Sequence, residues 1–397
     1  MSNSETAVPW DSPTVQAILA STLVLPLGVP LLSPVLTVIR DAFGITDAQT
    51  SLLITAYFVP GIVLSPVIGM LADRYGRRRV IIPSLFAFGL TGGLAAFATD
   101  FGTVLVLRLF QGTASAGVFI LTVTFISDVF EGIQRNAVLG INAAVLFAGA
   151  AIYPFVGGAL AAIDWHVPFL VYLIAIPVGL FAIRALEEPP SVRPKTGPSY
   201  LRGAIDALPV REAGALYGAT FVLEAVAFGT ILTALPFVLT AEFRVAPVII
   251  GTVLTIETIA SVKNGALARR WSNHRLVALS FLCYGVGLVV VWAGSSVGSI
   301  TVGAAVVGVG FGLALPSIDA AIGRIAPPEY RAGALSIRNG TTFLGRSAGP
   351  IAYTSLAIGF GYSALLLASG VLTLAIGAVT VVVTDAESHL DAESVPR

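Results

Sequence analysis

The stretch GMLADRYGRRR occupies residues 69–79, where a long apolar run gives way to charge. Its charged residues are Asp73, Arg74, Arg77, Arg78 and Arg79. Gly69 lets a neighbouring backbone come close, and Gly76 permits a tight turn. If the apolar run is a helix, Asp73 lies at its C-terminal end, where the helix dipole disfavours an anion. The stretch therefore predicts a helix end and a turn, with the arginines or another helix N-terminus as partners of Asp73.

The composition of the whole chain indicates a membrane protein. The chain is 56% hydrophobic and 11% charged, whereas soluble domains average about 25% charged residues. Its mean hydropathy is +0.91, which indicates more apolar surface than one soluble core can bury. The 22 basic and 22 acidic residues cancel, so no nucleic-acid partner is expected. With one cysteine and three histidines, neither a disulfide framework nor a metal centre is expected.

Apolar runs of about 20 residues, the length that crosses a bilayer, recur along the chain and predict twelve transmembrane helices. Their ranges are 16–39, 50–72, 79–98, 103–128, 136–162, 166–185, 213–240, 247–268, 275–294, 298–321, 332–358 and 362–384. Prolines and basic residues interrupt the series between the sixth and seventh runs, which is typical of a linker. The predicted parts are an N-terminal tail (1–15), a six-helix bundle (16–185), a linker (186–212), a second six-helix bundle (213–384) and an acidic tail (385–397).

The basic residues fall mainly on one side of this topology. With the N-terminus inside, the cytoplasmic loops and ends hold sixteen lysines and arginines, and the other side holds only Arg40 and Arg244. By the positive-inside rule, both termini are cytoplasmic. No basic segment precedes the first apolar run, so this run is predicted as a transmembrane helix rather than a cleaved signal peptide. The expected location is the cell membrane.

The two halves of the chain repeat each other. A shift of 196 residues aligns GMLA at 69–72 with GALA at 265–268. The same shift pairs Ser84 with Ser280, Gly89 with Gly285, Gly112 with Gly308, Arg135 with Arg331, Leu139 with Leu335, Phe147 with Phe343, Gly149 with Gly345 and Pro154 with Pro350. Two related bundles that face each other across a cavity are typical of secondary transporters. The predicted fold class is an all-α polytopic membrane protein with two pseudo-symmetric six-helix bundles.

The stretch at 69–79 resembles the loop motif of the major facilitator superfamily, Gly-x-x-x-Asp-Arg-x-Gly-Arg-Arg/Lys, and the resemblance covers the whole chain. It implies the major facilitator fold and a cytoplasmic gate. The residues of that gate would be Gly69, Asp73, Arg74, Gly76, Arg77 and Arg78. Asp73 would latch the two halves together on the cytoplasmic side in the outward-open state. Arg269 stands at the matching place of the second half, so we expect a weaker latch there.

The predicted fifth helix carries a second motif. Its residues are Gly140, Gly149, Pro154, Gly157 and Gly158. Their spacing resembles the fifth-helix motif of proton-coupled drug exporters of the same superfamily, with Tyr153 in place of one glycine. The resemblance implies export. Small residues at this spacing also let helices pack closely, so packing alone is the alternative.

Charged residues inside apolar spans are costly and are therefore candidates for function. The segment RLFQG at 108–112 resembles the family's Arg-x-x-Gln-Gly motif, and we expect Arg108 and Arg346 to be charges of the cavity. For Arg108, snorkelling toward the interface is the alternative. The candidates for proton coupling are Glu224, Glu257 and Asp319, because a buried carboxyl group can exchange a proton near neutral pH. A permanent ion pair between Glu224 and Arg346 is the competing interpretation.

Other chemistries have no support in the sequence. The chain has no Gly-x4-Gly-Lys-Ser/Thr loop, no His-Glu-x-x-His and no Cys-x-x-Cys, so we predict no ATP use, no catalytic or metal site and no cofactor. The predicted function is secondary transport by alternating access, namely proton-coupled efflux of a small lipophilic organic compound by a monomer in the lipid bilayer. Uptake of a metabolite stays open, because Tyr153 departs from the exporter motif and the first helix carries no acidic residue. A membrane sensor or intramembrane enzyme is the alternative of a different class.

Overall fold

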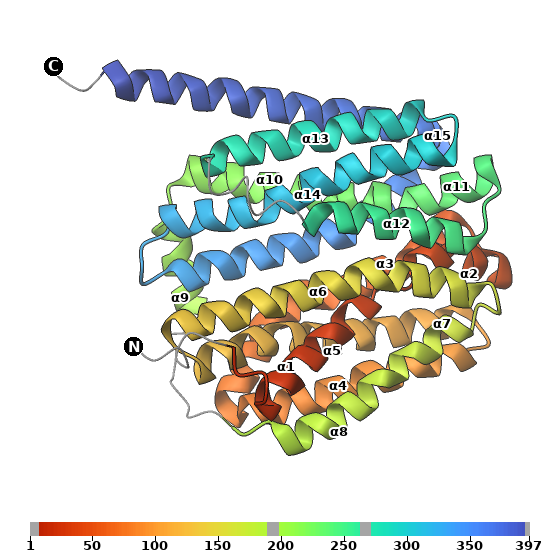
Figure 1. Cartoon of the computed structure of the whole chain (residues 1–397), viewed down its shortest axis with the longest axis horizontal. Coiled ribbons are helices and arrows are strands. Elements are labelled where there is room, and N and C mark those ends of the chain that lie inside the picture. The colour runs from red at the N-terminus through yellow and green to blue at the C-terminus, as the bar shows by residue number, and fades with distance from the viewer. Residues whose placement is uncertain (1–7, 189–197, 263–270, 394–397) are drawn as a thin grey trace.

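The computed structural model describes residues 8–188, 198–262 and 271–393, and all of its regular secondary structure is helical (Figure 1). The first half contains α1 (Pro13–Val24), η1 (Leu25–Leu27), η2 (Ser33–Val35), α2 (Leu36–Phe43), α3 (Asp47–Tyr75), α4 (Arg77–Leu94), η3 (Ala95–Phe97), α5 (Phe101–Val129), α6 (Gly132–Ala161), α7 (Val167–Leu170), η4 (Val171–Ile174) and α8 (Ala175–Ala185). The rest of the chain contains α9 (Pro198–Asp206), α10 (Val210–Gly229), the π-helical turn η5 (Thr230–Ala234), α11 (Leu235–Phe243), α12 (Pro247–Val262), α13 (Asn273–Ala293), α14 (Val297–Ile325) and α15 (Arg331–Glu393). Parts of the predicted tails, of the linker and of the helix 247–268 lie outside the described residues, as does Arg269.

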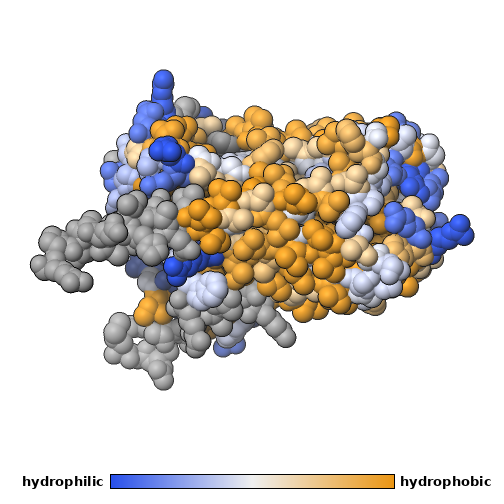
Figure 2. Space-filling model, turned by 90° about the horizontal axis from the view of Figure 1, so that it is seen from above, coloured by the Kyte–Doolittle hydropathy of each residue, from blue (hydrophilic) through white to orange (hydrophobic). Residues whose placement is uncertain are grey.

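The described helices account for the twelve predicted membrane spans. Nine helical segments within the described ranges are long and apolar enough for a crossing. The last of these holds two crossings, because Gly361 has a non-helical φ of 75° and divides α15. The shorter apolar helices Pro13–Leu27 and Pro247–Val262 lie within the remaining two predicted spans. Figure 2 shows a wide apolar belt with hydrophilic side chains gathered at its two ends. The predicted class, an all-helical polytopic membrane protein, is confirmed.

Polar side chains at the short loops determine where helices begin. Thr46 forms a capping box with Gln49 at the start of α3, and Ser296 does the same at the start of α14. Asp100 accepts a 2.9 Å hydrogen bond from the backbone N–H of Thr103 at the start of α5. Each cap satisfies backbone donors that the first turn leaves free. Short capped loops then force successive helices to run antiparallel.

The apolar run at 16–39 predicts one continuous helix, and this prediction is wrong. The run consists of α1, η1, a turn, η2 and α2, because three prolines lack the backbone N–H that a helix interior needs. These prolines are Pro26, Pro30 and Pro34. The corresponding helix of the second half contains the π-helical turn η5 between α10 and α11. The two interruptions touch, since the Ser33 hydroxyl donates a 2.6 Å hydrogen bond to the Leu232 carbonyl oxygen.

The two halves lie side by side and share two seams. Helix α1 begins and α15 ends at the left of Figure 1, and we call this the termini-bearing end and the other the opposite end. Helix α6 packs against α12, and α3 packs against α15. A methyl group on Gly158 would lie 2.3 Å from the Pro247 carbonyl oxygen, and one on Gly251 would lie 2.1 Å from that of Pro154. The seam between α6 and α12 therefore depends on glycine.

The predicted linker contains a helix. Helix α9 packs against the start of α15 at the termini-bearing end. The Tyr200 hydroxyl donates a 2.9 Å hydrogen bond to the Glu329 carbonyl oxygen, and the rings of Tyr200 and Tyr330 lie 5.6 Å apart. Ala204 is fully buried in this contact. Helix α9 is thus attached to the second half.

Candidate functional site

The charged stretch at 69–79 forms an ion-pair cluster at the termini-bearing end. Arg77 is almost completely buried, with 3% of its side chain exposed. Its guanidinium lies 3.0 Å from the Asp73 carboxylate at the end of α3 and 2.9 Å from the Asp128 carboxylate at the end of α5. Arg77 therefore links α3, α4 and α5 of the first half. A latch between Asp73 and the second half stays a prediction.

A carboxylate far along the chain caps the helix that follows this stretch. The Glu188 carboxylate accepts hydrogen bonds from the backbone N–H groups of Arg77, at 2.5 Å, and of Arg78, at 3.1 Å. An anion at a helix N-terminus satisfies free donors and matches the helix dipole. Gly76 precedes the helix with φ 103°, and a methyl group there would lie 2.5 Å from a Glu188 oxygen. The positive φ therefore requires glycine, and a larger residue would also displace the Glu188 carboxylate from the start of α4.

Arg108 lies among the helices of the first half. Its side chain is fully buried. The guanidinium donates to the carbonyl oxygens of Gly28 at 2.7 Å and Leu53 at 3.1 Å, and to the Gln111 side chain at 2.6 Å. It also lies over the Tyr57 ring, 4.5 Å from the centroid. Arg108 thus bridges helices of the first half through these carbonyl oxygens, and its expected role as a charge of the cavity stays a prediction.

Glu224 and Arg346 form an ion pair at mid-depth. Two guanidinium nitrogens of Arg346 lie 2.9 and 3.1 Å from the two Glu224 oxygens. Glu224 is fully buried, whereas 24% of the Arg346 side chain is exposed. The guanidinium also packs on the rings of Phe58, 5.6 Å away, and Phe228, 5.0 Å away. Since Phe58 belongs to the first half, the pair lies where the two halves meet.

The other two carboxylate candidates differ in their partners. Asp319 pairs with Arg338, whose Nε lies 2.6 Å from one carboxylate oxygen and whose second nitrogen contacts the other. Glu257 is half-buried and accepts a 3.0 Å hydrogen bond from the Thr258 hydroxyl. Glu257 makes no ion pair with any residue in the described ranges. Two of the three candidate carboxylates are therefore paired with an arginine and the third is not, and their role in proton coupling stays a prediction.

The glycines of the fifth-helix motif have unequal surroundings on α6. A methyl group on Gly157 would lie 1.9 Å from the Leu31 carbonyl oxygen, and one on Gly149 would lie 3.0 Å from Pro26. A methyl group on Gly140 would meet no atom within 4 Å. Tyr153, which replaces a glycine of the motif, donates a 3.0 Å hydrogen bond to the Leu23 carbonyl oxygen. The motif thus packs on the broken first helix and, through Pro154 and Gly158, on α12.

Aromatic rings from both halves pack together beside Arg346. The Phe58 ring lies 5.2 Å from the Phe228 ring and 6.1 Å from the Phe343 ring. The Phe119 ring lies 6.2 Å from Phe343. A methyl group on Gly61 would lie 2.8 Å from the Phe343 ring. This cluster places an apolar, polarisable surface against the central ion pair.

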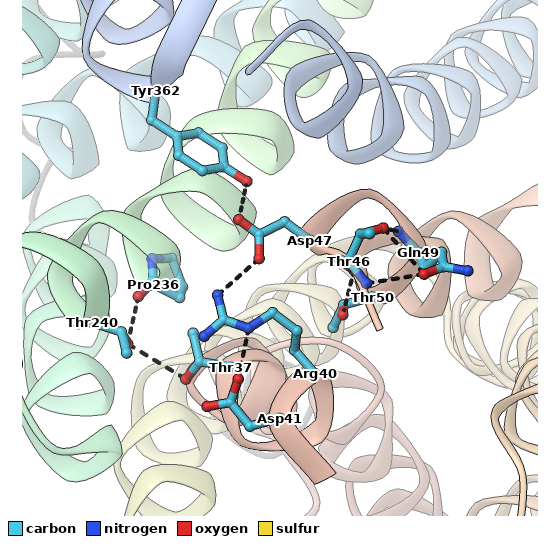
Figure 3. Close-up of polar contacts among 10 residues, drawn as sticks. All are labelled: Thr37, Arg40, Asp41, Thr46, Asp47, Gln49, Thr50, Pro236, Thr240 and Tyr362. Carbon is cyan, nitrogen blue, oxygen red and sulfur yellow. Dashed lines mark hydrogen bonds and ion pairs between the residues drawn. The ribbon is translucent and has the colours of Figure 1, made fainter. Parts of the chain in front are cut away.

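A polar cluster joins the two halves at the opposite end (Figure 3). Asp47, at the start of α3, lies 2.9 Å from a guanidinium nitrogen of Arg40 and accepts a 2.9 Å hydrogen bond from the Tyr362 hydroxyl. Arg40 also bonds Asp41 at 2.8 Å and lies over the Phe237 ring, 5.7 Å from its centroid. Tyr362 and Phe237 belong to the second half. We call the cluster of Arg40, Asp47 and Tyr362 the outer polar cluster.

Further hydrogen bonds close the same side of the bundle. The hydroxyls of Ser51 and Thr354 lie 2.9 Å apart, and the Thr55 hydroxyl donates to the Ser347 carbonyl oxygen at 2.8 Å. Across the other seam, the Thr255 hydroxyl donates to the Ala151 carbonyl oxygen at 2.6 Å. Together with the outer polar cluster, these contacts hold the halves together from mid-depth to the opposite end.

The sequence did not mark several residues of these clusters. Asp128 and Glu188 follow apolar runs, where a charge is ordinary, and Asp47 and Tyr362 lie at loops. One sequence feature could have indicated a residue such as Glu188. Helix α4 begins directly after the Gly76 turn, so its first backbone N–H groups need an acceptor from elsewhere in the chain. No group of three or more potential metal ligands occurs among the described residues.

Comparison with known proteins agrees with this architecture. The model of the family described as Major Facilitator Superfamily matches residues 18–256 and 217–396. The fold is similar to that of a bacterial homologue of the human lysosomal transporter Spinster, with a TM-score of 0.79 and 16% identity over 94% of this chain and 96% of the other. It is also similar to the nucleoside transporter NupG, with a TM-score of 0.78 and 12% identity over 94% and 99% of the two chains.

Relatives with known names match part of the chain. The bacillibactin exporter of Bacillus subtilis (strain 168) is 37% identical over 154 residues, which are 37% of this chain and 38% of the relative. The quinolone resistance protein NorA of Staphylococcus aureus (strain MRSA252) is 31% identical over 144 residues, or 36% and 37% of the two chains. The matched segments thus span less than half of each relative. The twelve crossings, the paired bundles, the charged turn at 69–79 and the family match together show that this chain belongs to the Major Facilitator Superfamily of membrane transporters.

Proposed function

We propose that this chain is a secondary active transporter of the cell membrane that works by alternating access and exports a small lipophilic organic compound in exchange for protons. In this proposal the termini-bearing end is cytoplasmic, since it holds most of the basic residues. The contacts that join the halves lie from mid-depth to the opposite end, so the described state is closed toward the outside.

The ion pair between Glu224 and Arg346 is the observation that carries the proposal. A fully buried carboxylate is placed where the two halves meet, against a guanidinium that is 24% exposed. Protonation of Glu224 would remove its charge and release Arg346 from a bidentate partner. A proton would thereby change the contacts at the boundary between the halves, which is what coupling to a conformational equilibrium requires.

The aromatic cluster beside this pair supports a lipophilic substrate. Phe58 and Phe228 flank the guanidinium of Arg346, and Phe343 lies next to Phe58. Substrate pockets combine such apolar and aromatic walls with a few polar groups. Export, as the direction, is supported by the relatives, one of which is called a bacillibactin exporter and another a quinolone resistance protein.

Transport in proteoliposomes tests the proposal. The purified chain is reconstituted in vesicles with an acidic interior that contains a pH-sensitive dye. A panel of lipophilic cations and neutral aromatic drugs is then added outside. For a substrate of an exchanger, we expect the interior to become alkaline as protons leave, and we expect neither ATP nor a sodium gradient to replace the pH gradient.

The same assay identifies the alternatives. With the pH gradient reversed, so that the exterior is acidic, acidification of the interior on substrate addition would indicate uptake together with protons and would overturn export. Absence of any substrate-dependent pH change, with a protein that binds compounds of the panel, would overturn proton coupling.

A further inference from the structure

A cavity of about 550 Å³ lies at the termini-bearing end, outside the boundary between the halves. The end of α3, the start of α4 and the end of α8 enclose it. Figure 1 shows α4 and α8 along the outer edge of the first half, away from the second half. The walls carry Tyr75, three arginines and the apolar side chains of Ile183 and Leu186. The cavity is therefore open to the surroundings of the protein and separate from the central ion pair.

The three arginines of this cavity have donors to spare. The Arg78 guanidinium makes one hydrogen bond, of 2.6 Å, to the Ile183 carbonyl oxygen, and its Nε is buried without a partner among the described residues. Arg79 and Arg184 are exposed, and neither makes an ion pair with a described residue. Guanidinium groups bind phosphate with two parallel hydrogen bonds. Their arrangement fits an anion with several oxygens.

The carboxylates of the cavity do not neutralise this charge. Glu187 is exposed and lines the cavity. Glu188 is engaged with the backbone N–H groups of Arg77 and Arg78 at the start of α4. Three guanidinium groups thus face two carboxylates, one of which already serves as a helix cap. The cavity keeps an excess of positive charge.

The position of the cavity indicates the kind of anion. On α8, Leu180 is 47% exposed and Ile183 is 41% exposed, and on α4 Leu90 is 48% exposed. Along α4 and α8 these apolar side chains lie nearer the middle of the helices than the arginines do, and Tyr75 is of the type that gathers at membrane interfaces. A ligand with a phosphate group and acyl chains would match both parts. Basic cavities on the cytoplasmic side of transmembrane helices bind anionic headgroups in this manner.

We propose that this cavity binds the phosphate group of an anionic phospholipid of the inner leaflet, with the acyl chains along α4 and α8. The inference rests on the cytoplasmic orientation proposed above, and it does not depend on the substrate or on proton coupling. Because Glu188 caps α4 next to Arg77, a lipid held by Arg78 also steadies the start of α4, where Arg77 pairs with Asp73 and Asp128.

Lipid binding to the purified full-length chain tests the proposal. Native mass spectrometry counts retained lipid, and the melting temperature in detergent is followed as phosphatidylglycerol or phosphatidylcholine is added. We expect phosphatidylglycerol to bind and to raise the melting temperature, and phosphatidylcholine to have a much smaller effect. The double variant Arg79→Gln/Arg184→Gln should bind phosphatidylglycerol about thirtyfold more weakly, as expected for the loss of two interfacial charges.

The matched control is the double variant Arg202→Gln/Arg211→Gln, which removes two exposed arginines of the same end outside the cavity. It should keep the affinity of the unchanged chain. Equal loss in both double variants would mean general surface attraction and would overturn the site. Arg78→Lys, which keeps the charge and loses the fork of donors, should give an intermediate affinity.

Glycerol phosphate separates a lipid from a soluble phosphate compound. It carries the same phosphate chemistry without acyl chains, so we expect it to stabilise the chain far less than phosphatidylglycerol. If glycerol phosphate matches the lipid, the cavity is a site for a soluble phosphate and the lipid assignment is wrong. Since binding is measured without transport, failure here leaves the proposed export untouched, and failure of export leaves this site untouched.

Discussion

The Tyr362 hydroxyl donates a 2.9 Å hydrogen bond to the Asp47 carboxylate, although 315 positions separate the two residues. The bond joins the second half, just beyond the Gly361 break, to the first turn of α3 in the first half. Arg40 holds the other oxygen of Asp47 at 2.9 Å and lies over Phe237 of the second half. Figure 3 shows Asp47 between Tyr362 and Arg40. The halves are therefore tied at the opposite end through one carboxylate.

The variant Tyr362→Phe should loosen this end. It removes one hydrogen bond to a carboxylate and keeps the aromatic ring, so we expect the closed state to lose about 1.5 kcal/mol, a roughly tenfold shift of the equilibrium toward opening. Spin labels at Ile163 and Ser295, in a Cys283→Ser background, would report a larger population of long distances. The control Tyr200→Phe removes a hydroxyl at the termini-bearing end and should leave this distribution unchanged. The same shift in both variants would contradict the assignment of the closure to Tyr362.

The variant Glu224→Gln separates a proton carrier from a structural partner of Arg346. A carrier should lose gradient-driven transport but still exchange substrate, because the neutral amide resembles the protonated acid. If Glu224 is a structural partner, its loss should instead lower expression and lower thermal stability by about 3 kcal/mol, since the partly buried Arg346 is left without its partner. Transport assays and melting curves distinguish the two results. Glu212→Gln, an exposed change in the same helix, is the control. A stable variant that still pumps would move attention to Glu257 and Asp319.

The variant Asp73→Asn should leave the protein folded and inserted but slow its turnover. Arg77 keeps Asp128 as a partner at 2.9 Å, so the melting temperature should fall only slightly. Asp128→Asn should behave alike, because it removes the other half of the same cluster. The exposed change Asp206→Asn in α9 should have no effect. Full transport rates in both cluster variants would show that the cluster serves stability alone.

The variant Gly157→Ala should destabilise the protein, whereas Gly140→Ala should be tolerated. The added methyl would lie 1.9 Å from the Leu31 carbonyl oxygen at residue 157 and would meet no atom within 4 Å at residue 140. Because backbone must shift at the first position, we expect a cost of about 1–3 kcal/mol and a loss of transport. Melting temperatures and transport rates of the two variants are compared directly. Equal tolerance would mean that the fifth-helix motif does not mediate packing.

Much of the fold followed from local sequence alone. A crossing needs about 20 apolar residues, so the runs themselves located the helices, and the duplicated pattern of residues indicated two bundles. The charged turn at 69–79 indicated the family. The first run contains the prolines that interrupt its helix. Its length and apolar composition nevertheless predicted one continuous helix.

Tertiary structure decided which charges meet. Whether Arg108 faces a cavity or the carbonyl oxygens of Gly28 and Leu53 depends on how its helix is rotated within the bundle. Glu188 meets Arg77 from 111 positions away, and Asp47 meets Tyr362 from 315. At helix ends such polar residues are ordinary in sequence, because water can satisfy them equally well. Only the packing of the helices, which sets their rotation and depth, determines that another helix supplies the partner instead of water.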